Sequence, residues 1–160
     1  MNRPRYETEY DIKNERTVRE ILKEYHDNCS LEKPKNAHYS QIDFFAFHQS
    51  KCIGLFEIKC RNFFWGKHST VMLSSGKWAE GFKYSQALSV PFYFIVSAYD
   101  GTFQYKQDIN DVISGKIICE WKGRTDAIRD SGDLEPTMMI PNELFVKISE
   151  ENAWTNKPSE

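Results

Sequence analysis

Two carboxylates and one ammonium have the residue types and the spacing that suit a chemical site. Asp43 interrupts one apolar stretch, and Glu57 and Lys59 interrupt the next, around Ile58. If the polar turn between the stretches centres near Ser50, Asp43 and Glu57 are each seven residues from it and lie opposite each other on paired strands. Opposed residues share one face, with Cβ atoms about 4.5–5.5 Å apart. Strand alternation places Lys59 on that face too. A one-residue shift of the turn would instead place Asp43 on the opposite face from Glu57 and Lys59.

A divalent cation would reconcile these charges. Two carboxylates this close do not both stay ionised without compensation, and Mg²⁺ takes one or two carboxylates while keeping several waters. The backbone carbonyl of Ile58, between Glu57 and Lys59, is a plausible third oxygen ligand. The metal would activate water and stabilise charge on a phosphate. Lys59 would orient or deprotonate that water, or neutralise the developing charge. The alternative is a buried salt-bridge cluster with a structural role.

A helix and a strand hairpin must position these groups. Apolar residues from Val18 to Tyr25 recur at the spacing of one helical face, which predicts a helix from about Asp11 to His26. A loop is predicted from Asn28 to Asn36. Tyr39 to Phe47 and Ile53 to Cys60 are predicted as the paired strands. Both are apolar almost throughout, as expected for strands covered on two faces.

A second helix and a buried strand are predicted after the hairpin. Ser75 is a candidate N-cap for a helix that runs to about Leu88. The apolar run Phe92 to Ala98 predicts a buried strand reached by a crossover. Asp100-Gly101 is a two-residue turn signal, and it leads into a strand from Thr102 to Lys106.

The last third of the chain carries weaker signals. We expect a strand from Lys116 to Trp121, a loop from Lys122 to Glu135, and a short helix from Asn142 to Ile148. Together the elements predict one mixed α/β domain over residues 1–150. Residues 151–160 are predicted to be a flexible tail.

The segments around Asp43 and Glu57-Ile58-Lys59 resemble the Asp…Glu-x-Lys signature of the PD-(D/E)XK nuclease superfamily. The resemblance covers roughly residues 11–98, and Ile42 stands where the name-giving motif has proline. It implies the restriction-endonuclease-like fold, a mixed β-sheet core flanked by helices in the order α-β-β-α-β-β. It further implies Asp43 and Glu57 as metal ligands and Lys59 as the catalytic lysine of a Mg²⁺-dependent nuclease, with Mn²⁺ as a substitute.

Five further residues are candidates for this site. Glu15 belongs on or beside the apolar face of the first helix, and some branches of the superfamily place a glutamate there in the metal site. Lys77, Tyr84 and Gln86 are polar residues of the second helix, where some branches contact phosphate. Arg61 shares the strand parity of Lys59 and could clamp a phosphate. For each, the competing interpretation is a solvated or packing role.

The charge distribution is compatible with a nucleic-acid partner. The net charge is −2, but residues 57–83 hold five basic and two acidic residues. Residues 126–160 hold three basic and eight acidic ones. Phosphate steering depends on such a local face rather than on the sum. Aromatic residues at 63–65 lie beside basic residues at 67–68, and the rings could stack bases or simply pack over the sheet.

We therefore expect phosphodiester hydrolysis, most plausibly in DNA, during recombination, repair or phage DNA processing. A homodimer would place two sites on two strands. The alternatives are an inactive nucleic-acid-binding module on the same fold and an interaction protein. No apolar stretch suits a membrane span or a secretory signal, so we expect a cytoplasmic protein. The four cysteines form no Cys-x-x-Cys pair, which disfavours structural zinc and favours buried, reduced thiols.

Overall fold

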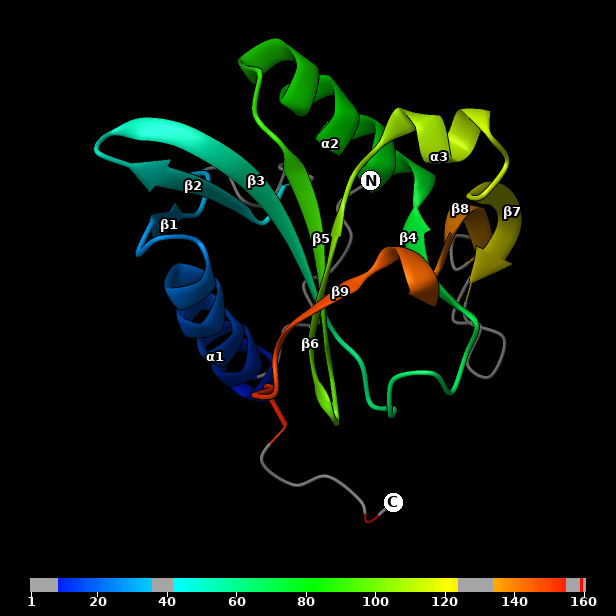
Figure 1. Cartoon of the computed structure of the whole chain (residues 1–160), viewed down its shortest axis with the longest axis horizontal. Helices are drawn as coiled ribbons and strands as arrows, with labels where there is room; N and C mark the ends of the chain where they lie inside the picture. Colours follow the sequence, from blue (N-terminus) through cyan, green and yellow to red (C-terminus); the bar gives the residue numbers. More distant parts are fainter. Residues whose placement is uncertain (1–8, 36–41, 124–133, 155–158, 160) are drawn as a thin grey trace.

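The computed structural model describes residues 9–35, 42–123, 134–154 and 159, which form the coloured ribbon in Figure 1. Within these ranges the chain forms a six-stranded sheet, a three-stranded sheet and three α-helices. No helix there is both long enough and apolar enough to cross a membrane.

The large sheet has the strand order β1-β2-β3-β5-β6-β9. Its strands are β1 (Ser30–Glu32), β2 (Phe44–His48), β3 (Lys51–Cys60), β5 (Phe92–Ala98), β6 (Gly101–Lys106) and β9 (Val146–Ser149). The pair β3 and β5 is parallel, and each other neighbouring pair is antiparallel. A parallel pair needs a crossover, and here it contains β4 (Thr70–Ser74) and α2 (Ser75–Leu88).

The β2–β3 hairpin has a tight turn and a bulge. Gln49 and Ser50 form the turn, and both have positive φ, 48° and 63°, as a two-residue hairpin loop requires. The register shifts by one residue between Ala46 and Phe47 because β3 holds one extra residue there. Beyond the bulge the register pairs Phe44 with Phe56. Without the bulge, Phe44 would pair with Leu55 instead, and its side chain would face the same side of the sheet as Leu55.

One face of the large sheet is covered by α1 (Glu9–Tyr25), at the lower left of Figure 1. The helix packs Val18 and Leu22 against a wholly apolar patch of the sheet that includes Phe44, Phe56 and Ile95. All five side chains are at most 1% exposed. This face is a continuous hydrophobic core.

The other face is covered by α2 and by a small antiparallel sheet, β4-β8-β7, with β7 (Ile118–Gly123) and β8 (Leu134–Pro141). Figure 1 shows α2 at the top and the small sheet at the right, next to α3 (Ile109–Ile113). Their apolar side chains join the large sheet in a second core, composed of Ile42, Leu55, Val71, Leu73, Trp78, Phe92, Phe94, Val96, Tyr105, Ile117, Met138 and Ile140. This second core has a polar neighbour in the charged groups described below.

The expected α/β class and restriction-endonuclease-like layout are confirmed. The first helix, the hairpin strands, the second helix and the buried strand lie within a few residues of their predicted bounds. The second helix begins at Ser75 as predicted, although its N-cap is Ser74. Residues 39–41 of the first predicted strand lie outside the described residues.

Several predictions for the remaining segments were wrong. The expected loop at 28–36 contains β1. No element was predicted where β4 precedes α2. The predicted turn Asp100-Gly101 is displaced by one residue, since Gly101 already pairs with Ala98. The helix expected over 142–148 is instead a short 3-10 turn followed by β9. The expected loop at 122–135 includes the ends of β7 and β8, and residues 124–133 lie outside the described residues.

The segment predicted as a tail begins with residues that pack on the sheet. Ala153 is buried and its backbone N–H donates to Ser97 Oγ at 2.9 Å. Asn152 Nδ2 donates to the carbonyl of Tyr99, and Trp154 Nε1 to that of Ser97. Residues 152–154 therefore pack against the large sheet.

Candidate active site

The charged cluster lies on the α2 side of β3 because of strand alternation. Phe56 and Ile58 face the α1 core, and Leu55 faces the α2 core. Glu57 and Lys59 share the parity of Leu55 and face α2. Two residues that break an apolar strand are therefore presented together at one helix.

Glu57 is a fully buried carboxylate between two ammonium groups. Its side chain is 0% exposed, and Oε1 lies 2.8 Å from Lys59 Nζ and 2.6 Å from Lys77 Nζ. The other oxygen, Oε2, is buried and has no hydrogen-bond partner among the described residues. A buried carboxylate oxygen without a partner is energetically unfavourable. It is the one feature of the site that calls for an additional positive ligand.

Asp43 lies opposite Glu57, as the spacing predicted. It directly precedes β2, and continuing the Phe44–Phe56 register by one step places it across from Glu57. Asp43 Oδ2 accepts a hydrogen bond of 2.9 Å from the backbone N–H of Ile58, and Oδ1 lies 4.0 Å from Lys77 Nζ. The carboxylate is thus fixed to β3, and it is partly exposed at 29%.

The bulge in the hairpin is what makes this pairing possible. At the turn, His48 pairs with Lys51, and in that register Asp43 would face Phe56. The extra residue in β3 moves the register by one position before the cluster is reached. The side chain of Asp43 is thereby placed on the face of Glu57 rather than in the α1 core.

Lys77 belongs to the first turn of α2. The Ser74 side chain caps this helix by accepting from the backbone N–H of Lys77 at 3.3 Å. The first turn contains no acidic residue, and a cation there is disfavoured by the helix dipole. The ion pair with Glu57 compensates for that position.

Burial and neighbouring charges perturb the two strand residues in a coupled way. Burial raises the pKa of Glu57 above its ordinary value, and the charge of Asp43 adds to this. The charges of Lys59 and Lys77 lower the pKa of Glu57, but the net shift is upward. Burial lowers the pKa of Lys59, but the charges of Glu57 and Asp43 raise it by more, so the net shift of Lys59 is also upward. The pKa values of Glu57 and Lys59 are therefore coupled to each other through their opposite charges.

The donor set fits a hard divalent cation. Glu57 Oε2 is unpaired, and Asp43 Oδ1 faces the same cluster. The N–H of Ile58 points to Asp43, and in a strand the carbonyl of the same residue points to the same side. Three oxygen donors from adjacent positions are the ligand type that Mg²⁺ or Mn²⁺ takes in proteins. The described residues contain no group of three or more Asp, Glu, His or Cys side chains that could hold a metal.

The structure does not bring Glu15 to Asp43 and Glu57. Its carboxylate lies 2.7 Å from Lys33 Nζ, beyond the end of β1, and its helix covers the opposite face of the sheet. Arg61 follows β3, and its backbone N–H donates to the carbonyl of Ser97 at 2.9 Å. Its charge is close enough to Lys59 to lower the pKa of that residue.

The two other predicted residues of α2 are separated from the cluster. Tyr84 lies two helical turns beyond Lys77, about 10 Å along the axis, and its ring packs edge-to-face on Phe45 with centroids 5.9 Å apart. Gln86 is exposed near the end of the helix. A difference of nine residues places it on the opposite side of α2 from Lys77.

The aromatic loop after β3 packs mainly within the protein. Trp65 stacks on Phe103 with centroids 3.9 Å apart, and its backbone N–H donates to Asp100 Oδ1. Phe64 packs on Tyr99, and Phe63 on His68. The packing interpretation of this segment is therefore favoured for Trp65.

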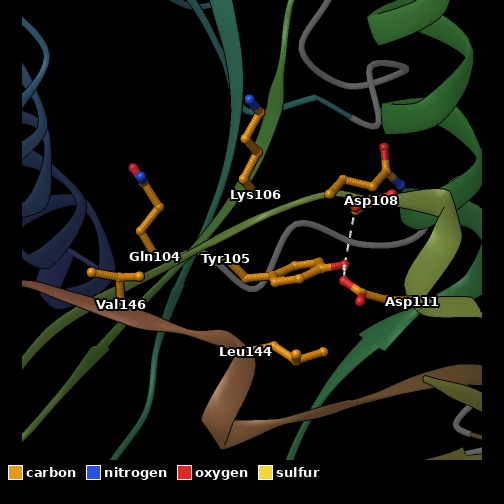
Figure 2. A pocket seen from close by; sticks show the side chains of 8 residues that line it. Gln104, Tyr105, Lys106, Asp108, Asp111, Leu144 and Val146 are labelled. Atoms are coloured by element: carbon orange, nitrogen blue, oxygen red, sulfur yellow. Dashed lines mark hydrogen bonds between the residues drawn. The ribbon is translucent and has the colours of Figure 1, made fainter. Parts of the chain in front are cut away.

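A separate hollow of about 340 Å³ contains no cluster residue. Figure 2 shows it between β6, α3 and the segment leading into β9. Tyr105 Oη donates to Asp111 Oδ2 at 2.8 Å, and burial raises the pKa of Tyr105, so this contact stays neutral on the tyrosine side. The charges of Glu57, Lys59 and Lys77, rather than the size of this hollow, identify the candidate active site.

Sequence reasoning did not foresee two features. It treated Lys77 as a possible phosphate ligand and not as a counterion of Glu57. The signal was a lysine in the first helical turn with no acidic neighbour there. It also assumed an unbulged hairpin, and nothing in Cys52-Ile53-Gly54 except the glycine points to the bulge.

Comparisons with known proteins agree with this arrangement. The family model for the phage putative PDDEXK endonuclease matches residues 1–148. Among solved structures, the chain is similar to Hjc of Archaeoglobus fulgidus, a Holliday junction resolvase from an archaeal hyperthermophile. The TM-score is 0.51 at 14% identity, over 85% of this chain and 92% of that chain, and it shows a shared fold. A comparison with curated proteins gives no match.

Proposed function

Because the chain belongs to the phage putative PDDEXK endonuclease family, we propose that it is a metal-dependent endonuclease that hydrolyses phosphodiester bonds of DNA. The observation that carries the proposal is the buried Glu57 carboxylate, whose Oε2 has no partner among the described residues although Asp43 and Lys59 adjoin it. A purely structural ion-pair cluster would satisfy both oxygens.

Each residue of the cluster has a role in this proposal. Asp43, Glu57 and the Ile58 carbonyl would hold Mg²⁺, with Mn²⁺ as a substitute. When bound, the metal supplies an activated water and stabilises charge on the phosphate. Lys59 orients that water or neutralises the charge that develops on the phosphate. Its ammonium is already directed to the site by Glu57, at 2.8 Å.

Four other residues are proposed to act on the nucleic acid. Lys77 is the best supported, since its ammonium is at the cluster and only partly exposed. Arg61 lies just beyond Lys59 in the chain, where it can meet the next phosphate. Tyr84 and Gln86 lie further along α2 and could contact DNA only away from the metal. Glu15 is not assigned to the metal site, because its helix covers the opposite face of the sheet.

DNA processing in recombination, repair or a phage life cycle is the proposed context. The family description points to phages, and the protein of similar fold is named for resolving Holliday junctions. One site cuts one strand, so a double-strand cut requires a second copy of the chain or a second binding event. The compartment proposed for this activity is the cytoplasm.

The test is cleavage of supercoiled plasmid and of single-stranded DNA by the purified protein in Mg²⁺, Mn²⁺ or EDTA. Nicked or linear product is expected with metal and not with EDTA. Lys59→Ala should abolish it, while Lys83→Ala, a matched change at an exposed lysine of α2, should not.

The alternative is an inactive DNA-binding module on the same fold. It predicts a DNA mobility shift with no product under any metal condition. Equal cleavage by the wild type and Lys59→Ala would instead indicate a contaminating nuclease and would remove the support for this site.

A further inference from the structure

Within the described part of the chain, β7 is an edge strand of the small sheet. Among the described residues its only strand neighbour is β8. An unpaired edge exposes backbone N–H and C=O groups that can pair with another chain. The other sheet edges are formed by shorter strands, since β1 has 3 residues, β9 has 4 and β4 has 5, whereas β7 has 6. Short edge strands are one of the ways in which proteins avoid such pairing.

Two large apolar side chains of β7 are exposed, one on each face of the strand. Trp121 is 66% exposed and Ile118 is 51% exposed. Isolated exposed apolar residues are ordinary, but an exposed tryptophan on an unpaired strand edge offers a large contact area. Tryptophan is also among the residues that most often anchor protein interfaces. These features indicate a docking edge.

The charges of β7 identify what would dock. Glu120 and Lys122 flank Trp121, and their side chains lie on one face of the strand with Nζ and Oε2 3.4 Å apart. In an antiparallel pair of two such strands centred on Trp121, each Glu120 lies opposite Lys122 of the partner subunit. Pairing centred on Glu120 or on Lys122 would place like charges opposite each other, which is destabilising. Of these three registers, only the one centred on Trp121 places opposite charges across from each other.

We propose that β7 is a homodimer interface, in which two copies of this chain pair their β7 strands antiparallel about Trp121. The two small sheets then form one continuous six-stranded sheet, and the two tryptophans lie side by side at the two-fold axis. Such an interface is isologous, as in most homodimers. It names the surface for the second copy that a double-strand cut requires, but it is argued from β7 and not from nuclease activity.

The proposed register can be tested by disulfide trapping. Opposed residues of an antiparallel pair have Cα atoms about 4.5–5.5 Å apart, within the range that a disulfide spans. Cys119→Ser/Trp121→Cys should therefore form a covalent dimer on mild oxidation. The native Cys119 residues would be four positions out of register, about 13 Å apart, and should not cross-link. Cys119→Ser/Lys83→Cys, with its thiol on exposed α2, is the matched control.

Charge reversal tests the same register without oxidation. Sedimentation velocity of the wild type should show a concentration-dependent monomer–dimer equilibrium. Glu120→Lys or Lys122→Glu should each weaken association by about tenfold, because two attractive pairs become repulsive. The double swap Glu120→Lys/Lys122→Glu should restore it.

Two results would overturn the proposal. One is a wild type that stays monomeric at every concentration together with no cross-link through position 121. The other is a dimer that neither single reversal weakens, which would place the interface elsewhere. Neither measurement uses DNA or metal, so their failure leaves the proposed nuclease activity to its own test.

Discussion

The two faces of the large sheet differ although one set of strands forms both. On the α1 face, β3 contributes Phe56 and Ile58 to a core of apolar side chains, where the ring of His26 also packs on Phe56. On the α2 face, the same strand contributes Leu55 to a core but then presents Glu57 and Lys59 to Lys77. Alternation along one strand thus separates a face that only stabilises from a face that also carries charge.

A buried charged cluster lowers the stability of the α2 face relative to the apolar α1 face. Replacing a buried ion-pair cluster by apolar residues is often neutral or stabilising. The α2 face keeps its cluster nonetheless, with one buried carboxylate oxygen unpaired among the described residues. Variants of the α1 face should therefore change stability without changing chemistry, and variants of the cluster should do the reverse.

The largest expected effect is the loss of activity in Glu57→Gln. The side-chain volume is retained, but the charge that would bind metal is lost, and we expect DNA cleavage to fall by a factor of about 10²–10³ or more. Cleavage rates at saturating Mg²⁺ measure this. Glu80→Gln, which alters a partly exposed carboxylate of α2, is the control and should retain the wild-type rate. A fully active Glu57→Gln would contradict the assignment of the site.

The next effect concerns the α1 face. Leu22→Ala removes a fully buried side chain and should lower the free energy of unfolding by about 2–5 kcal/mol. Cleavage per folded molecule should be unchanged. Urea unfolding and activity of the folded fraction measure the two quantities. Ile12→Ala, at a 56% exposed position of the same helix, should have little effect on either. A loss of chemistry in Leu22→Ala that exceeds its loss of folded protein would break the distinction between the faces.

A smaller effect is expected for metal affinity in Lys77→Met. The ammonium of Lys77 lies 2.6 Å from Glu57 Oε1 and would repel an incoming dication. Its removal should tighten Mn²⁺ binding by about tenfold, or about 1.4 kcal/mol, in calorimetry without DNA. Lys83→Met, with its exposed ammonium, should bind Mn²⁺ as the wild type does. Weaker binding by Lys77→Met would show that this lysine organises the carboxylates instead.

The smallest effect is expected at the cap of α2. Ser74→Ala removes the acceptor for the backbone N–H of Lys77 and should lower the free energy of unfolding by about 1 kcal/mol. Activity should fall only slightly, since the Lys77 side chain is still held by Glu57. Thermal unfolding compared with Ser75→Ala, one residue into the helix, measures the contribution of the cap. Equal effects of the two changes would show that the cap is not specific.

The sequence predicted the central strands of the large sheet and singled out the charged residues of the cluster because local patterns specify them. It missed the edge strands β1 and β9. The apolar run at 92–98 and the helical spacing at 18–25 each specify one element. Asp43, Glu57 and Lys59 stand out as charges inside apolar strands, and the seven-residue symmetry about Ser50 gave the right pairing. The turn is in fact centred between Gln49 and Ser50, and the bulge then shifts the register by one residue, so that Asp43 still lies opposite Glu57.

Of the small sheet, the sequence predicted only a strand at 116–121, close to β7, because β4 and β8 have little local signal. β4 is a five-residue segment directly joined to a helix, and β8 contains Pro136 and ends at Pro141. Proline is uncommon inside strands. The residues that pair between β4 and β8 are more than 50 positions apart in the sequence. For the same reason the position of Lys77 at the cluster depends on how the crossover places α2 against β3, which no local pattern encodes.

The most direct test of the central claim is to locate bound metal by NMR. Mn²⁺ broadens the signals of nearby nuclei, so substoichiometric Mn²⁺ is added to labelled protein without DNA. We predict that the amide signals of Asp43 and Ile58 broaden first, while those of Val18 and Leu22 on the other face of the sheet persist. Competition with excess Mg²⁺ should restore the broadened signals. Broadening centred elsewhere, or none in this region, would contradict the assignment of Asp43 and Glu57 as the metal site.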